Sequence, residues 1–363
     1  MIDISVIVPM YNAKDYIVSC INGILSQSGG NIEVVVVNDC STDGCMELCK
    51  DTFKDNDNVQ LIDQPHNMGP GEARNTGIKH ARGKYITFVD SDDAVRQGAY
   101  KEMLDAALKY DADILHVTGV IMQTVDNAPI DLNELTEDEV FHVTLDEGQK
   151  KTECCLITND IGERLKSWLS HELHWAIWNK LYKRSFLLEN NILFGKMKFA
   201  EDQVFSFHCL CRAKNYVILP GEWYMYRIGG ESLSRGRKGA SFMIKAITAQ
   251  LDMPECMNKA MAGVDYFELN PDKKKEAIDY VYKALEDGFV VPTFKDAGVE
   301  ALKEDEKLHD VFVSYFGENA CFVERQFYMA HENLPEGDSL YDAITTPAFW
   351  RSVKESQQAQ VTN

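Results

Sequence analysis

The stretch YITFVDSDDA, residues 85–94, decides how this chain can fold. Its first half is apolar or β-branched, as in a strand that is buried on both faces. Its second half holds three acids, Asp90, Asp92 and Asp93. Because three carboxylates at the end of a core strand repel one another, they cost free energy unless something offsets their charge. The cluster therefore indicates a binding site at the end of a buried strand.

Four more apolar runs, rich in Val and Ile, occur in the first 120 residues, at 4–9, 32–39, 59–63 and 113–120. Helix-like segments lie between the runs, at 14–27, 43–53, 70–81 and 97–109. This alternation predicts an α/β sheet with parallel strands and right-handed crossovers. Such sheets bind their ligands at the carboxyl ends of the strands, which is where the acids lie.

Length and charge narrow the class of protein. The 363 residues, 45% of them hydrophobic, suffice for two domains or for one domain with an extension. A net charge of −20 repels nucleic acid, so we expect no nucleic-acid partner. No apolar run reaches the roughly 18–20 residues of a membrane span, and the first residues lack the basic region of a secretory signal. We expect a cytoplasmic protein, with a peripheral position at the inner face of the membrane as the alternative.

Two tempting motifs fail on spacing. In HELHW (171–175) the histidines His171 and His174 are three apart, whereas the metalloprotease motif needs four. The glycine-rich GPGEARN (69–75) has Arg74 where a dinucleotide fingerprint needs its third glycine, and it follows the third strand, not the first. Arg74 is instead a candidate for contact with a phosphate or a base, with a surface position as the alternative.

Two groups of acids are candidates for chemistry. Oxygen ligands such as those at 90–93 suit magnesium or manganese, whose shell phosphate and water would complete. The alternative is a solvated turn in which Asp92 or Asp93 caps the helix near residue 97. Glu201 and Asp202 begin an apolar helix over 202–212, where acids serve either as caps or as a general base. The sequence leaves both readings open.

Six motifs, in order and at ordinary spacing, resemble family 2 glycosyltransferases with the GT-A fold. They are ISVIVPMYN, VVVVNDCSTDG, NMGPGEARNTGIKHARGKYITFVDSDD, WNKLYKRSFL, FAEDQVFSF and YRIGGESLSR, the last three as in many bacterial, polysaccharide-type members. The resemblance implies a GT-A nucleotide-binding fold, with a mixed, mainly parallel sheet and flanking helices. It spans about 4–235 and implies a domain over 1–235, with a nucleotide-binding half (1–120) and an acceptor-side half (121–235).

The rest of the chain is outlined by composition. We expect residues 121–162 to form an irregular, acidic insertion. Residues 236–363 are interpreted as a helical C-terminal extension, with helices expected over 240–262, 272–288, 297–316 and 318–331. These helices are a candidate surface for self-association or for a partner enzyme.

The resemblance also implies roles for single residues. The nucleotide-sugar donor would contact Pro9, Tyr11, Asn12, Asp39, Arg74, Asp90 and Ser91. Asp39 would hold the base, most often uracil. Asp90 and Asp92 would bind a divalent metal, manganese or magnesium, and Asp202 would be the catalytic base. Trp178, Glu201 and Arg227 are placed on the acceptor side, while Asp93 receives no role.

The sequence departs from the family pattern at two positions. Asn38 stands where the family often has Asp, and Cys40 stands where it often has Gly. Because Cys tolerates positive φ less well than Gly, we expect the turn at Cys40 to differ.

The function implied is an inverting glycosyltransferase of hexosyltransferase type. It would move a sugar from a nucleotide diphosphate, most often UDP, to a hydroxyl of a glycan or lipid-linked sugar acceptor. Aromatic residues such as Trp178, Tyr224 and Tyr226 would contact sugar rings or belong to the core. A nucleotidyltransferase is the second hypothesis, but its glycine-rich basic loop is missing after the first strand. A catalytically silent nucleotide-sugar-binding or scaffold subunit is the third, and the presence of both Asp92 and Asp202 disfavours it.

Overall fold

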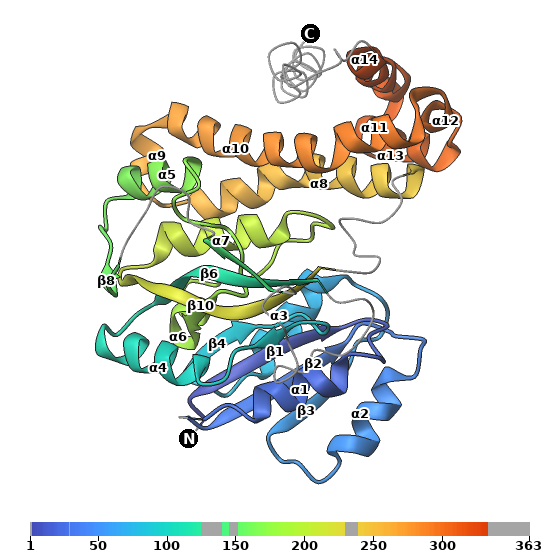
Figure 1. Ribbon diagram of the computed structural model, residues 1–363. Helices are drawn as coiled ribbons and strands as arrows, with labels where there is room; N and C mark the ends of the chain where they lie inside the picture. The colour runs from blue at the N-terminus through green and yellow to red at the C-terminus, as the bar shows by residue number, and fades with distance from the viewer. Residues whose placement is uncertain (1, 29, 125–139, 145–151, 229–238, 333–363) are drawn as a thin grey trace. The chain divides into compact units, whose positions relative to one another are not determined.

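The computed structural model describes residues 2–28, 30–124, 140–144, 152–228 and 239–332. The chain divides into two compact units, and Figure 1 traces both. The first unit comprises Met1–Lys196, Glu201–Gly230 and Ala260–Glu268, and the second comprises Met197–Ala200, Glu231–Lys259 and Leu269–Asn363. The predicted boundary at residue 235 falls in 229–238, outside the described residues, and stays a prediction.

A mixed sheet forms the centre of the first unit, with the order β3-β2-β1-β4-β9-β6-β10-β5 (Figure 1). Its strands are β1 (Ile4–Met10), β2 (Ile32–Asn38), β3 (Val59–Asp63), β4 (Tyr85–Phe88), β5 (Ala94–Val95), β6 (Ile114–Thr124), β7 (Val140–Thr144), β8 (Cys155–Leu156), β9 (Lys180–Lys183) and β10 (Tyr216–Ile228). Strands β3, β2, β1 and β4 are parallel, as are β6 and β10, whereas β9 runs antiparallel between β4 and β6. The predicted mixed, mainly parallel sheet is confirmed.

The first four predicted helices are present as α1 (Ile17–Leu25), α2 (Cys45–Phe53), α3 (Pro70–His80) and α4 (Ala99–Lys109). They are followed by α5 (Ile161–Leu169), α6 (Arg184–Glu189) and α7 (Glu201–Arg212). Helices α2 and α4 begin two residues later than expected, because Gly44 and Gly98 precede them with φ of 83° and 79°. That left-handed conformation cannot continue into an α-helix, and glycine adopts it without strain.

The expectation of an irregular insertion over 121–162 was wrong for its described parts. Strand β6 continues to Thr124, β7 pairs antiparallel with β6, and β8 pairs with β10. The pairing partners come from elsewhere in the chain, so the short runs at 140–144 and 155–156 carried no local signal. Residues 125–139 and 145–151 lie outside the described residues.

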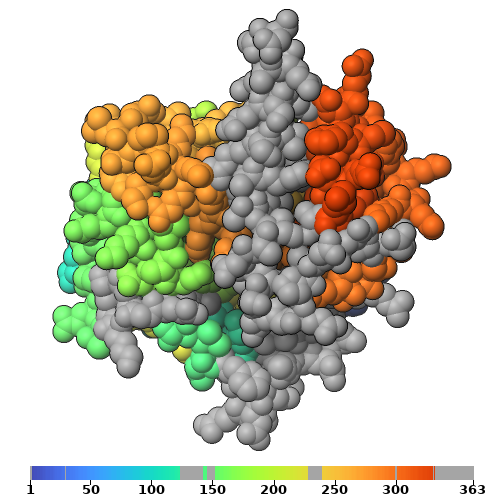
Figure 2. All heavy atoms as spheres, turned by 90° about the horizontal axis from the view of Figure 1, so that it is seen from above, coloured from blue at the N-terminus to red at the C-terminus, as the bar shows by residue number. Residues whose placement is uncertain are grey.

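The described part of the C-terminal region, residues 239–332, is helical, as predicted. Its elements are α8 (Ala240–Met261), α9 (Asp265–Leu269), α10 (Pro271–Leu285), the π-helix η2 (Glu286–Val290), α11 (Val291–Ala297), α12 (Val299–Lys303), α13 (Glu306–Phe316), the 3₁₀-helix η3 (Gly317–Asn319) and α14 (Ala320–Glu332). Figure 2 shows the face on which side chains of the later, orange to red helices gather. The single helix expected over 297–316 is broken, because the Asp305 carboxylate accepts the Leu308 N–H at 3.1 Å and caps a new helix.

The short segment Met197–Ala200 belongs to the second unit, although Glu201 and Asp202, which follow it directly, belong to the first. The ring of Phe199 stacks on Phe289 with centroids 4.5 Å apart and also contacts Phe242. Ala200 has φ of 57°, which is uncommon for a residue with a side chain. Ala200 therefore carries backbone strain directly before Glu201.

Candidate active site

The carboxyl ends of β1 and β2 bring together the residues that were predicted to surround the nucleotide base. Pro9 lies in β1, and Tyr11, which is 53% exposed, and Asn12 follow it. Asn12 donates its backbone N–H to Ser41 Oγ at 3.0 Å, and its Oδ1 accepts the Thr42 N–H at 2.8 Å. Because the turns after the two strands are bonded to each other, they form one surface at this edge of the sheet.

Asp39 lies at the same edge and is almost fully buried. Its Oδ1 accepts the Met68 N–H at 2.7 Å and its Oδ2 accepts the Gly69 N–H at 2.8 Å. Asp39 therefore fixes the loop that leads into α3, a task that the sequence did not reveal. A carboxylate oxygen has two lone pairs, so either oxygen can still accept a bond from a nucleotide base.

Cys40 adopts the conformation that a glycine would take. Its φ is 61°, and its thiol donates to the carbonyl oxygen of Gln64 at 3.2 Å. The turn after β2 is therefore left-handed at this residue in spite of the side chain. The strain of such a φ amounts to about 1 kcal/mol, which the surrounding bonds offset.

The acid loop, residues 90–93, follows β4, and its last member is buried. Asp93 Oδ2 accepts the Tyr224 hydroxyl at 2.6 Å, and its Oδ1 accepts the Arg227 N–H at 2.8 Å. Burial raises the pKa of Asp93 well above its usual range, and the charges of Asp92 and Asp90 raise it further. Three acids are therefore crowded at this strand end, as the sequence predicted, and the crowding disfavours the charged form of Asp93.

The two remaining acids of the loop fit a divalent metal. The Asp90 side chain is 34% exposed and Asp92 is partly exposed, so both are nearer to solvent than Asp93. Within the described ranges, no group of three or more Asp, Glu, His or Cys side chains forms a ready-made cation site. Magnesium is commonly held by one or two carboxylates with phosphate oxygens completing its shell. The donor set at Asp90 and Asp92 matches that arrangement, and a cation there would offset the repulsion within the loop.

Arg74 joins the acid loop to the base motif, by which we mean the two acids that begin α7, Glu201 and Asp202. Its side chain is buried and bonds Asp90 Oδ1 at 2.9 Å and Glu201 Oε1 at 3.1 Å. Its guanidinium also lies 5.6 Å from the centroid of the Phe194 ring. Arg74 is thus in direct contact with two other predicted site residues, although Arg74 and Glu201 are 127 positions apart in the sequence.

The two acids that begin α7 are in different surroundings. Glu201 is buried, and its pKa is raised to about 7. Burial is the main cause of the shift, the Asp202 charge adds to it and Arg74 opposes it. Asp202 is partly exposed, and its Oδ1 accepts the N–H of Gln203 at 2.8 Å. Burial raises the pKa of Asp202 as well, while Arg74 lowers it. Glu201 is therefore committed to Arg74, and Asp202 is the carboxylate closer to solvent.

The acceptor-side residues divide into two kinds. Trp178 stacks on Tyr224 with ring centroids 4.4 Å apart and on Tyr226 at 6.0 Å, and Trp178 and Tyr226 are partly exposed. Arg227 is buried, its Nε donates to the Asp92 carbonyl oxygen at 3.0 Å, and its guanidinium lies 4.7 Å from the centroid of the Tyr16 ring. Arg227 therefore contacts the acid loop directly, which its place in the sequence did not indicate.

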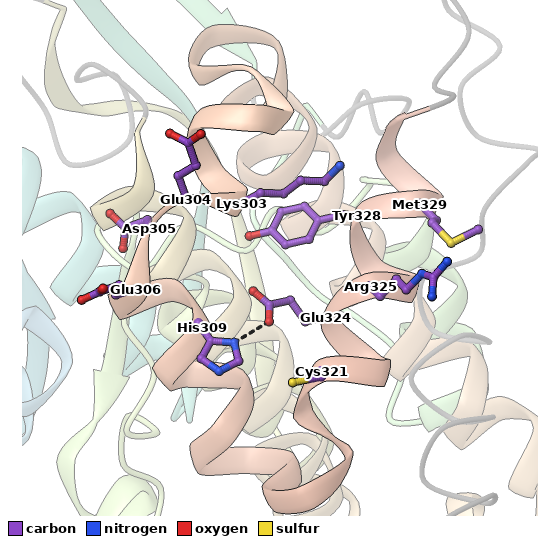
Figure 3. Close-up of a pocket in the computed structure, with 10 residues that line it drawn as sticks. All are labelled: Lys303, Glu304, Asp305, Glu306, His309, Cys321, Glu324, Arg325, Tyr328 and Met329. Carbon is purple, nitrogen blue, oxygen red and sulfur yellow. Dashed lines mark hydrogen bonds and ion pairs between the residues drawn. The ribbon is translucent and has the colours of Figure 1, made fainter.

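The second unit contains a pocket that the sequence did not predict (Figure 3). Its volume is about 720 Å³, and it is lined by Lys303, Glu304, Asp305, Glu306, His309, Cys321, Glu324, Arg325, Tyr328 and Met329. His309 Nδ1 lies 2.6 Å from Glu324 Oε2. None of the predicted site residues lines this pocket.

Among the described residues, none of the helices has both the length and the apolarity that crossing a lipid bilayer requires.

The family is shown by comparison with known sequences. A model of glycosyl transferase family 2 matches residues 5–202, and the chain belongs to this family. It is 32% identical over 232 residues to the uncharacterized glycosyltransferase EpsJ of Bacillus subtilis, covering 64% of this chain and 62% of that protein. It is 28% identical over 340 residues to the minor teichoic acid biosynthesis protein GgaA of the same bacterium, covering 91% of this chain and 69% of that protein. The match thus spans less than two thirds of the length of EpsJ.

Solved structures show the same fold. Residues 1–349 of S. aureus TarS, in complex with UDP-GlcNAc, superpose with a TM-score of 0.57 at 20% identity. The match covers 99% of this chain and 92% of that one. A second TarS structure, in complex with UDP, gives a TM-score of 0.56 at the same identity and coverage. The GT-A fold implied by the sequence motifs is confirmed.

Proposed function

We propose that the protein is an inverting, metal-dependent glycosyltransferase that moves a sugar from a UDP-sugar to a hydroxyl of a glycan or lipid-linked acceptor. The observation that carries the proposal is the bridge from Asp90 through Arg74 to Glu201, which places the acid loop beside the base motif. The complexes of TarS with UDP and UDP-GlcNAc support a uridine nucleotide as the donor. The name of GgaA supports a cell-surface polymer as the product.

The donor would bind along the edge formed by the ends of β1, β2 and β4. Asp39 would accept a bond from the base, next to Pro9, Tyr11 and Asn12. The sugar and diphosphate would then lie near Arg74, Asp90 and Ser91. Asp90 and Asp92 would hold manganese or magnesium, which supplies positive charge that stabilises the departing diphosphate.

The transfer itself would need one general base. Asp202 would take the proton of the acceptor hydroxyl while that oxygen attacks the anomeric carbon. The bond from this carbon to the acceptor oxygen forms as its bond to the diphosphate oxygen breaks, and the electron pair leaves with UDP. Because the attack comes from the face opposite the leaving group, the anomeric carbon is inverted. Trp178 and Tyr226 would provide aromatic faces for the acceptor sugar.

A screen of UDP-sugars with and without manganese tests this proposal. At about 100 times its dissociation constant, the correct donor should stabilise the protein by about 2.7 kcal/mol, seen as a rise in Tm. Manganese-dependent release of UDP should follow when an acceptor is added. Binding without any UDP release across a broad set of acceptors would favour the silent subunit. Release of a sugar 1-phosphate in place of UDP would favour a nucleotidyltransferase.

A further inference from the structure

Asp93 is occupied by the protein itself. Its side chain is only 3% exposed, and each carboxylate oxygen accepts a bond from β10, one from the Tyr224 hydroxyl and one from the Arg227 N–H. A carboxylate held at both oxygens has little freedom to turn toward a ligand. Asp90 and Asp92, in contrast, are partly exposed.

A single hydroxyl ties both ends of the acid loop. Tyr224 donates to Asp93 Oδ2 at 2.6 Å and accepts the Asp90 N–H at 3.1 Å. Within the loop, the Asp93 N–H donates to the Asp90 carbonyl oxygen at 3.0 Å, which closes a turn. The side chains between these ends therefore project from a loop whose two ends are fixed to the same oxygen atom.

Strand β10 holds the loop at two further points. The Nε of Arg227 donates to the Asp92 carbonyl oxygen at 3.0 Å, and β5, which directly follows the loop, pairs antiparallel with β10 in the register Tyr224↔Val95. The loop from β4 is thus positioned by a strand more than 120 residues further along the chain. These contacts orient the loop and leave its two partly exposed acids at the surface.

We propose that Asp93 is a positioning residue and not a metal ligand: with Tyr224 it orients Asp90 and Asp92 to bind the divalent cation. The inference rests on the proposed function and adds to it the roles of Asp93 and Tyr224. Groups that orient the ligands of a metal typically account for a factor of about 10–100 in metal affinity. The hydroxyl of Tyr224 should have an effect of that size although it touches no cation.

Tyr224→Phe is the direct test, because it removes the hydroxyl and keeps the ring that stacks on Trp178. Calorimetric titration of UDP at a series of manganese concentrations measures the apparent metal affinity without any need for turnover. We expect that affinity to fall about 10–100-fold, while the binding of UMP without metal stays the same. A metal affinity equal to that of the unmodified protein would overturn the proposal.

Tyr100→Phe is the matched control. The Tyr100 hydroxyl is also buried and has no hydrogen-bond partner among the described residues, and its side chain lines the same small cavity as Tyr224. Removing it should leave the manganese affinity unchanged. An equal loss in both variants would mean that any cavity in this region weakens the site, and it would also overturn the proposal.

Asp93→Asn separates positioning from ligation. If Asp93 acts through the loop, Asp93→Asn and the double variant with Tyr224→Phe should lose similar amounts of manganese affinity. The reason is that both substitutions act on the same hydrogen bond, between Tyr224 and Asp93. If Asp93 binds the metal, Asp93→Asn alone should lose manganese binding while Tyr224→Phe keeps it. Asp92→Asn serves as the reference. If Asp92→Asn loses manganese-dependent binding while Tyr224→Phe keeps it, the proposed function stands and the inference is refuted. Absence of manganese-dependent binding in the unmodified protein would refute both.

Discussion

The acid loop of the first unit and the pocket of the second unit differ in almost every respect. The groups of the loop at 90–93 are fixed by bonds to α3, α7 and β10, directly or through Arg74. The pocket in Figure 3 has a volume of about 720 Å³ and is lined by side chains from α12, α14 and the start of α13, several of them exposed. The loop joins residues that are far apart in the sequence, whereas the pocket joins neighbours.

This difference teaches which of the two regions is fixed enough for the transfer of a group. Transfer of a group needs charged side chains that stay in place while the reaction proceeds, since reorganising them would add to the barrier. The loop has this property, because two side chains hold it in place. Arg74 bonds Asp90 and also Glu201, and Tyr224 bonds Asp90 and also Asp93. In the pocket, the close pair His309 and Glu324 is the clearest fixed contact, and the His309 side chain is 42% exposed.

The largest expected effect is on turnover, when the proposed general base Asp202 is replaced. Asp202→Asn should lower turnover by a factor of about 10²–10⁴ with donor affinity retained, because an amide has the shape of the carboxylate but cannot take the proton. Steady-state rates and separate donor titrations measure the two effects. Glu201→Gln is the matched control and should be milder, since Glu201 is committed to Arg74. The opposite ranking would assign the base to Glu201.

The second effect is on the affinity for UDP, when the proposed pocket for the nucleotide base is changed. Asp39→Ala should weaken UDP binding by about 10–100-fold, because it removes the acceptor for the base and also leaves the Met68 and Gly69 N–H groups without their bonds, at a cost of about 1–3 kcal/mol. Calorimetry measures the affinity, and Tm reports the loosened loop. An unchanged affinity would place the nucleotide elsewhere.

The third effect depends on pH. Burial raises the pKa of Glu201 from about 4.5 to about 7, so the folded chain keeps this proton longer than the unfolded chain. The stability linked to it is fully present below pH 4.5 and is lost as the pH rises through about 7. Between these values the unmodified protein should lose about 1–3 kcal/mol more free energy of unfolding than Glu201→Gln. Denaturant titrations across this range measure the difference, and parallel profiles would show that Glu201 is ionised throughout.

The smallest effect belongs to the pocket. Glu324→Gln weakens the pair with His309 and should cost no more than about 1 kcal/mol of stability, because the His309 side chain is partly exposed to water, which screens the pair. Its UDP affinity and its manganese dependence should equal those of the unmodified protein. A loss of UDP binding in Glu324→Gln would reverse the comparison between the two regions.

Much of the fold could be predicted from the sequence, because buried parallel strands leave continuous apolar runs and the helices between them have a clear pattern. The break at Asp305 was missed, since an Asp inside an apolar helical pattern differs from a cap only in its backbone conformation. The motifs also named Asp90, Arg74 and Glu201 separately, but no local signal shows that Arg74 bonds both acids. The hold of Tyr224 on the loop depends on the register of β10 with β5, which is set by distant pairing and leaves no trace in either segment.

The central claim is that the acid loop is the metal-dependent donor site, and one titration tests it most directly. UDP is titrated by calorimetry into the unmodified protein and into Asp92→Asn, each with and without manganese. We expect manganese to strengthen UDP binding to the unmodified protein and to leave Asp92→Asn nearly unaffected, because the substitution removes a charge from the ligand set and keeps its shape. Equal manganese enhancement in both proteins would contradict the claim and would place the metal outside the acid loop.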